Sequence, residues 1–194
     1  MYAHAERVLV YLGRSHALGI TYSKHAPRNK LEAYADSDWS VKRSTTGNVV
    51  MYAGGAIGCS SKRQHCIAVS SCEAELMALA ACALEVLFFK GILAAMGEEI
   101  DEAIDVFTDN KAAHDLCHRH SSGQHSRHVD RKMYKMRELR GSGVVNVLKI
   151  DGAKNPADLF TKPLTRQPFE EHRKTVMNTT VRTADKSRTN VRQR

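Results

Sequence analysis

Acidic side chains stand where predicted strands end and predicted helices begin. Asp36 and Asp38 lie two residues apart in an extended run, so both project from one face near its carboxyl end. Asp109 ends a second apolar run, Glu75 lies in the first turns of a long apolar segment, and Asp158 lies in the first turn of a short helix. Functional groups collect outside the carboxyl ends of strands in open α/β sheets, so we expect these acids to converge.

Converging carboxylates predict a metal site. They repel one another, and their pKa values rise unless a cation neutralises them. Mg²⁺ prefers hard oxygen ligands, and two ions about 3.5 to 4 Å apart activate a water and stabilise the leaving oxygen of a phosphodiester. Each acid taken alone is better explained as solvated surface charge or a helix cap. Four acids on different elements favour metal-dependent phosphodiester chemistry.

The apolar pattern of the first half predicts three strands and a packing helix. An amphipathic helix within residues 3–22 and a basic linker come first. An extended run at 31–39, two short runs within 48–59 around Gly54-Gly55, and a further run at 64–70 follow, and three adjacent antiparallel strands are the simplest prediction from them. The sequence from Ser70 to Glu73 is typical of a capping box, and the helix that it starts runs to about Gly97 with one broad side against the sheet.

The second half alternates strands and helices. A strand at 103–109, a helix from Asn110 to about Cys117, a helix at 128–141, a strand at 144–151 and a short helix from Pro156 follow in order. Strands joined through helices need crossover connections, so we expect an α/β fold with a mixed sheet. Past about Val176 the sequence is basic with little apolar content, which predicts a disordered tail.

Composition narrows the class of partner. A formal net charge of +8 favours nucleic acid, although a merely soluble basic surface explains the charge equally well. Five cysteines without a CxxC pair argue against a disulfide framework and a zinc ribbon. No apolar run approaches the roughly 20 residues that cross a bilayer, and no signal sequence follows Met1. We expect an intracellular protein of cytoplasm or nucleus, neither secreted nor membrane-spanning.

A zinc site is a weaker alternative for the histidine-rich stretch. His114 and His118 have the i, i+4 spacing of zinc ligands on a helix, with Cys117 between them. Further ligands would have to come from His120, His125 or His128. A polar loop near the substrate explains the stretch better.

Seven motifs resemble the ribonuclease H domain of copia-type retrotransposons. They occur in the order and approximate spacing of that family over residues 31–168: YADSDW, KRSTTGNVVMYAGGAI, SSKRQ, AVSSCEAELMAL, FTDNKAA, HSRHVD and PADLFTKPL. The resemblance implies a ribonuclease H-like α/β fold, whose five-stranded sheet has three antiparallel and then two parallel strands with helices on both faces. Residues 1–30 resemble the end of the reverse transcriptase connection, and residues 169–194 are expected to form a basic, disordered tail.

The resemblance also implies a catalytic site and a reaction. The metal ligands would be Asp36, Glu75, Asp109 and Asp158, with Asp36 bridging two Mg²⁺ ions and Mn²⁺ as an alternative ion. Helical periodicity leaves Glu73 and Glu75 open, and the family pattern selects Glu75. The implied enzyme is an endonuclease that hydrolyses the RNA strand of RNA:DNA hybrids during reverse transcription.

The implied partners are the RNA:DNA hybrid and the reverse transcriptase domain of the parent polyprotein, with no membrane. Hybrid contacts are expected from basic and imidazole side chains: Lys42, Arg43, Lys62, Arg63 and His128. One alternative is a catalytically inactive nucleic-acid-binding remnant, against which the intact acids count. Another is an integrase-like transferase, which should carry glutamate rather than aspartate at the last acidic position.

Overall fold

A five-stranded mixed sheet forms the centre of the molecule. The computed structural model describes residues 2–24, 30–118 and 127–179. The strand order is β3-β2-β1-β4-β5. The first three strands pair antiparallel and β1, β4 and β5 pair parallel, which confirms the predicted sheet. The strand bounds are β1 (Glu32–Asp38), β2 (Thr45–Tyr52), β3 (Gly55–Arg63), β4 (Ile104–Thr108) and β5 (Val145–Lys149).

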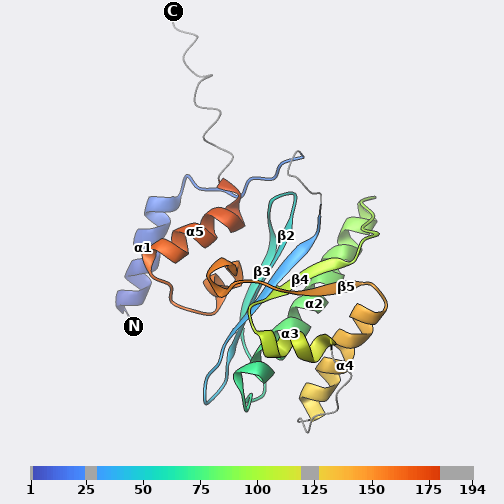
Figure 1. Cartoon of the computed structure of the whole chain (residues 1–194). Helices are drawn as coiled ribbons and strands as arrows, with labels where there is room; N and C mark the ends of the chain where they lie inside the picture. Colours follow the sequence, from blue (N-terminus) through green and yellow to red (C-terminus); the bar gives the residue numbers. More distant parts are fainter. Residues whose placement is uncertain (1, 25–29, 119–126, 180–194) are drawn as a thin grey trace, which may run out of the picture.

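Helices cover both faces of this sheet (Figure 1). One face carries α2 (Ser71–Ala95), α3 (Lys111–His118) and α4 (Arg127–Gly141). After β5 come the short 3₁₀ turns η1 (Gly152–Lys154) and η2 (Pro156–Phe160), and then α5 (Arg166–Met177). Both η2 and α5 lie over the other face, and α1 (Tyr2–Ser15) packs beside α5.

The predicted capping box begins α2. The Ser70 hydroxyl accepts a hydrogen bond from the Glu73 amide at 3.2 Å, and the Glu73 carboxylate accepts one from the Val69 amide at 2.9 Å. The first contact satisfies an amide that a helix start leaves without a partner, and the second ties the residue before the N-cap to the first turn. The helix is followed by Gly97, whose φ of +87° suits glycine. Because Glu73 is used by this cap, the first turn leaves Glu75 to project toward the end of the sheet.

Helix α2 is the core helix, and it is more apolar than expected. It is long and apolar enough to cross a membrane by length and composition alone, so the expectation that no apolar run approaches that length is wrong here. Its inner side, with Leu76, Leu79 and Val86 fully buried, packs in the main core. Its outer side leaves Leu84 and Phe88 about 60% exposed. The composition therefore reflects burial on a broad inner side together with an exposed apolar stripe.

The run at 64–70 was expected to be a strand, and this prediction is wrong. The antiparallel sheet ends with β3 at Arg63, and the following residues lead into α2. Ile67 and Val69 are exposed, so the alternation that predicted a strand has no buried side. The buried Gln64 side chain instead ties the segment to its neighbours, donating to Thr46 Oγ1 at 3.0 Å and to the Ala74 carbonyl at 2.9 Å.

The expected tail boundary at residue 169 is also wrong. Helix α5 continues to Met177, and its Val176 packs with Val49, Met51 and Ala56 in a second core on the outer face of the sheet. Phe169 meets the Tyr11 ring of α1 edge-on, with centroids 5.6 Å apart. A small number of apolar side chains is enough to dock this helix on the domain, because they lie on one side of it. Residues 180–194 lie outside the described residues.

The first segment is docked on the domain. Helix α1 ends at Ser15, before the end of the predicted range. Residues 16–24 follow it, and we call them the N-terminal arm. In this arm the Thr21 amide donates to the Met177 carbonyl at 3.0 Å, and the Tyr22 hydroxyl donates to the Ala56 carbonyl at 2.6 Å. The arm thus fastens both α5 and the start of β3.

Candidate metal centre

Three carboxylates from three separate elements meet at one end of the sheet. Asp36 lies near the end of β1, Asp109 follows β4, and Asp158 lies in η2. One carboxylate oxygen of each lies within 4.8 Å of the others. The Asp36 residue is 1% exposed, whereas the other two are half-buried. Among the described residues this is the group of acidic, histidine and cysteine side chains close enough to hold a metal ion.

Close packing of η2 on β2 places Asp158 beside Asp36. Gly47 pairs with Asp36 in the sheet. A Cβ atom on Gly47 would lie 2.6 Å from the Thr161 methyl carbon and 2.9 Å from the Ala157 carbonyl, so only glycine permits this approach. The buried Asn155 side chain adds a hydrogen bond to the Ala35 carbonyl at 3.0 Å, which fixes the start of η2 against β1.

Asp109 is held between a strand end and a helix start. The neighbouring Asn110 side chain accepts a hydrogen bond from the Ala113 amide at 3.0 Å and so begins α3. Gly152 lies close on the other side, where a Cβ atom would be 3.1 Å from Asp109 Oδ2. Burial raises the pKa of Asp109, and the charge of Asp36 raises it further, while Lys162 lowers it. The raised pKa of Asp109 thus comes first from burial and second from the neighbouring charge of Asp36.

Glu75 lies beside the three aspartates without joining them. Its Oε1 accepts a hydrogen bond from the Ser37 amide at 3.2 Å, and its Oε2 is buried with no hydrogen-bond partner among the described residues. Burial, followed by the charges of Asp36 and Asp109, raises the pKa of Glu75 to about 8. A buried carboxylate oxygen without a partner is costly, and a cation is the natural ligand for it.

Sequence reasoning missed two side chains that contact the aspartates. The Lys162 ammonium lies 2.9 Å from Asp158 Oδ1 and 3.3 Å from Asp36 Oδ1, and the Thr161 hydroxyl donates to Asp36 Oδ2. Burial works against the Lys162 charge, but the hydrogen bond to Asp158 and the charge of Asp36 outweigh it and raise its pKa. The i, i+4 spacing of Asp158 and Lys162 was the available signal.

The remaining predicted residues surround this end of the sheet. Asp38 is exposed at the end of β1 and is not part of the carboxylate group. Lys42 and Arg43 are exposed in the β1–β2 loop, and Lys62 and Arg63 are exposed at the end of β3. His128 lies in the first turn of α4, and its side chain lies outside the described residues.

The histidines of α3 contact each other. The His114 and His118 rings are stacked with centroids 4.2 Å apart, and His118 Nδ1 lies 2.8 Å from the His114 carbonyl oxygen. That nitrogen is engaged with the backbone. His120 and His125, the other suggested zinc ligands, lie outside the described residues.

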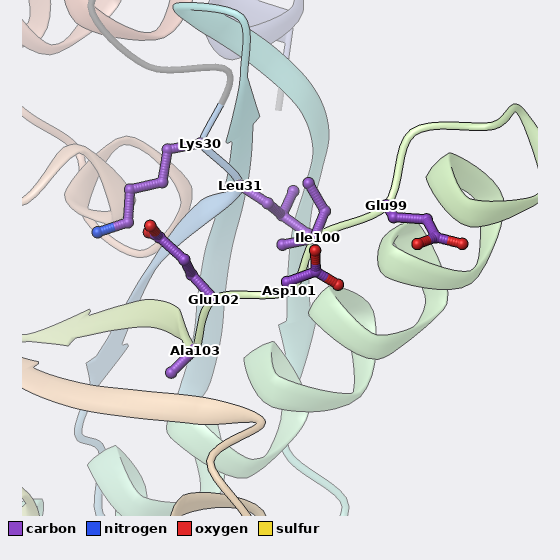
Figure 2. Close-up of a pocket in the computed structure, with 7 residues that line it drawn as sticks. All are labelled: Lys30, Leu31, Glu99, Ile100, Asp101, Glu102 and Ala103. Carbon is purple, nitrogen blue, oxygen red and sulfur yellow. The ribbon is translucent and has the colours of Figure 1, made fainter.

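A separate pocket of about 710 Å³ opens at the opposite end of the sheet. It is lined by Lys30, Leu31 and residues 99–103, ahead of β4, and Figure 2 shows Lys30 and Glu102 on one side with Glu99 near the end of α2. None of the predicted catalytic acids lines it, because Asp109 follows the other end of β4. This pocket is therefore distinct from the carboxylate group.

The sequence is similar to retrovirus-related Pol polyproteins of plant transposons. It is 33% identical over 144 residues to the protein from transposon TNT 1-94 of Nicotiana tabacum, covering 72% of this chain and 11% of that protein. It is 30% identical over 169 residues to the protein from transposon RE2 of Arabidopsis thaliana, covering 85% of this chain and 12% of that protein. The chain thus spans about a tenth of these relatives. No protein-family model matches it.

Solved ribonuclease H structures share the fold. The LC11 ribonuclease H1 isolated from compost has a TM-score of 0.54 at 20% identity, covering 69% of this chain and 94% of that one. The same LC11 enzyme in complex with an RNA/DNA hybrid has a TM-score of 0.51 at 16% identity, covering 68% and 94%. The chain is therefore a homologue of a segment of the Pol polyproteins of copia-type transposons, and it has a ribonuclease H-like fold.

Proposed function

We propose that this chain is a magnesium-dependent endonuclease that hydrolyses the RNA strand of RNA:DNA hybrids. The observation that carries the proposal is the meeting of Asp36, Asp109 and Asp158 within 4.8 Å, with Glu75 beside them. Structural zinc sites use sulfur and nitrogen ligands, whereas this donor set is entirely carboxylate oxygen, which Mg²⁺ prefers. The relatives' Pol polyproteins and the hybrid-bound ribonuclease H1 support the substrate class.

The four acids have separable roles in this proposal. Asp36, the most buried, would be shared between two ions, with Glu75 and Asp109 holding one and Asp158 the other. Two Mg²⁺ ions, or Mn²⁺ in their place, would lower the pKa of an attacking water and stabilise the leaving oxygen. The products would be a 3′-hydroxyl and a 5′-phosphate.

The chain's own side chains orient these acids. Thr161 and Lys162 hold both oxygens of Asp36, and the Ser37 amide holds Oε1 of Glu75. Asp36 and Glu75 are therefore held in defined orientations before a cation arrives. Such preorganisation reduces the rearrangement needed during reaction.

The hybrid would be recognised by shape and charge. Contacts to 2′-hydroxyl groups across the shallow minor groove select the RNA strand, while the DNA strand is held through its backbone. Phosphate contacts are proposed for the basic side chains and histidine near this end of the sheet: Lys42, Arg43, Lys62, Arg63 and His128. The reverse transcriptase domain of a parent polyprotein is the proposed protein partner, in an intracellular setting.

Purified protein incubated with an end-labelled RNA:DNA hybrid tests the proposal. We expect cleavage of the RNA strand with Mg²⁺, none with chelator, and a loss of at least about 100-fold in Asp109→Asn because the site loses a charged ligand. Asp101→Asn, an exposed acid near the other end of the sheet, is the matched control and should cut normally. Cleavage without metal, or cleavage unchanged in Asp109→Asn, would reject the mechanism. Hybrid binding without cleavage would favour the inactive remnant.

A further inference from the structure

A small polar cleft lies between the edge strand β3 and helix α4, and residues of α2 form part of its lining. It has a volume of about 200 Å³. We call it the β3–α4 cleft. Its lining comes from two strands, the β3–α2 loop and two helices: Thr46, Asn48, Ser60, Lys62, Arg63, Gln64, His65, Met77, Ala81, Glu85 and Lys132.

The floor of the cleft is polar where the sheet would otherwise pack against α2. On the α2 side of β2, Val50 belongs to the main core, but the next residues on that side are Asn48 and Thr46. The Ser60 hydroxyl donates to Asn48 Oδ1 at 3.0 Å, and Gln64 Nε2 donates to Thr46 Oγ1 at 3.0 Å. These three floor side chains, Asn48, Thr46 and Gln64, are buried. Apolar packing therefore stops at Val50, and a hydrogen-bonded polar floor begins.

The rim of the cleft is basic. Lys62 and Arg63 come from the end of β3, and Lys132 reaches in from α4. One carboxylate, Glu85, faces them, and its contact with Lys62 is long at 3.9 Å. The rim thus keeps a net positive charge over a floor rich in hydrogen-bonding groups. A phosphate group matches this chemistry, since it is anionic and accepts several hydrogen bonds.

The cleft shares one end of the sheet with the carboxylates. Asp36 pairs with Gly47, and Gly47 pairs with Ser61, the neighbour of Lys62. Two strand spacings separate β1 from β3, so Lys62 starts about 10 Å across the sheet from the Asp36 backbone. Lys62 points to the α2 side, whereas Asp36 lies on the side of η2. The cleft and the carboxylates thus lie at the same end of the sheet, about two strand spacings apart, which is short compared with the length of a bound duplex.

We propose that the β3–α4 cleft binds a backbone phosphate of the nucleic-acid substrate away from the bond that is cut, with Lys132 as a contact that the sequence did not suggest. This inference rests on the proposed function for the identity of the ligand. It assigns Lys62, Arg63 and Lys132 to one phosphate subsite, separate from the carboxylates.

Hybrid affinity as a function of salt tests this subsite. The dissociation constant of a fluorescent RNA:DNA hybrid is measured in chelator between 50 and 200 mM KCl for the full chain, Lys132→Gln and Lys135→Gln. Lys135 is the matched control because it lies on the same helix, exposed and paired with Glu138 at 3.2 Å. We expect Lys132→Gln to weaken binding about threefold to tenfold at the lowest salt and to reduce the salt slope by about 0.9, the value for one lost phosphate contact. Lys135→Gln should stay within about twofold.

Further measurements separate the possible outcomes. Lys62→Gln combined with Lys132→Gln should reduce the slope by about twice as much. Equal affinities and slopes for Lys132→Gln and Lys135→Gln would overturn the subsite. So would inorganic phosphate that binds the chain in a Lys132-dependent way while hybrid affinity does not depend on Lys132, because the cleft would then be a small-anion site. A chain that binds hybrid as expected but never cuts it with Mg²⁺ would overturn the proposed nuclease and leave the subsite standing.

Discussion

At the residue scale, the geometry of the carboxylate group depends on a position without a side chain. Gly47 lets η2 lie directly on β2, and η2 carries Asp158. We expect Gly47→Ala to cost about 1 to 3 kcal/mol of unfolding free energy, because the new methyl group meets backbone and side-chain atoms that cannot all move. Gly91→Ala, at an exposed site of α2 with open space around it, should gain up to about 1 kcal/mol. Denaturant unfolding measures both.

Each of these two variants is the control for the other, because the unfolding free energy should fall in Gly47→Ala and rise in Gly91→Ala. Both add one methyl group to a glycine in a regular element, so composition and mutation size are matched. Equal stabilities for Gly47→Ala and the unchanged chain would show that η2 is free to move away from β2, and the account of how Asp158 is placed would then be wrong.

Lys162 makes a second residue-scale prediction. Its ammonium contacts both Asp36 and Asp158, so it would repel a cation bound by these two carboxylates. Two like charges repel by an energy of order 1 kcal/mol even at 4 Å in water. We therefore expect Lys162→Gln to bind Mg²⁺ about tenfold more tightly in a calorimetric titration. Lys174→Gln, an exposed change on α5, should leave Mg²⁺ affinity unaltered. Weaker binding by Lys162→Gln would mean that the ammonium organises the acids more than it opposes the ion.

Single residues also show what could be predicted from the sequence. Asp36 and Asp109 were predictable because each lies near the end of a strand-like run, and Asp158 because it lies in the first turn of a short helix; all three also belong to family motifs. The choice of Glu75 over Glu73 was not available from periodicity, since the reason is that the cap consumes Glu73. The spacing of Lys162 from Asp158 signalled that pair, but the contact of Lys162 with Asp36 could not be predicted, because these two residues are 126 positions apart in sequence.

At the element scale, α5 closes the outer face of the sheet. Its Val176 covers Val49, Met51 and Ala56, and its buried His172 lies on the same helix. A chain that ends after residue 168 should lose about 3 to 5 kcal/mol of unfolding free energy, because several apolar side chains return to water. Thermal melting of that chain, beside one ending after residue 179, measures the loss. Equal melting temperatures for the two chains would show that α5 does not stabilise the fold.

Elements with long, capped or strongly periodic patterns were predictable, and short ones at the edges were not. The antiparallel strands, α2, α3 and the parallel strands have the expected order. The strand expected at 64–70 failed because alternation without burial carries no information about pairing. Helix α5 was missed because two apolar residues, Phe169 and Val176, supply its contacts within a charged stretch. Tertiary packing decided both outcomes.

At the scale of the whole molecule, the carboxylate group makes stability depend on pH. Burial and the neighbouring charges raise the pKa of Glu75 from its ordinary value to about 8. The folded chain then binds more protons than the unfolded chain between about pH 4.5 and 8, so the unfolding free energy falls as pH rises through this window. Asp109 and Asp158, whose pKa values are also raised, act in the same direction.

We expect metal-free protein to lose about 2 to 5 kcal/mol of unfolding free energy across that window. Glu75→Gln should lose much less, because the amide does not titrate. Glu138→Gln, an exposed change on α4, should retain the full pH dependence. Denaturant melts at several pH values in chelator measure the slopes. A stability that rises with pH in this window would contradict the placement of these acids.

The docking of the N-terminal arm on α5 joins residues that are synthesised far apart in time. Asn178 donates to the Thr21 carbonyl across a separation of 157 positions. During translation the arm and β2 are made before α5, so the apolar face of β2 stays uncovered until the residues of α5 have left the ribosome. A nascent chain stalled before α5 therefore exposes apolar surface that favours aggregation, and a chaperone that shields such surface would act before α5 is made.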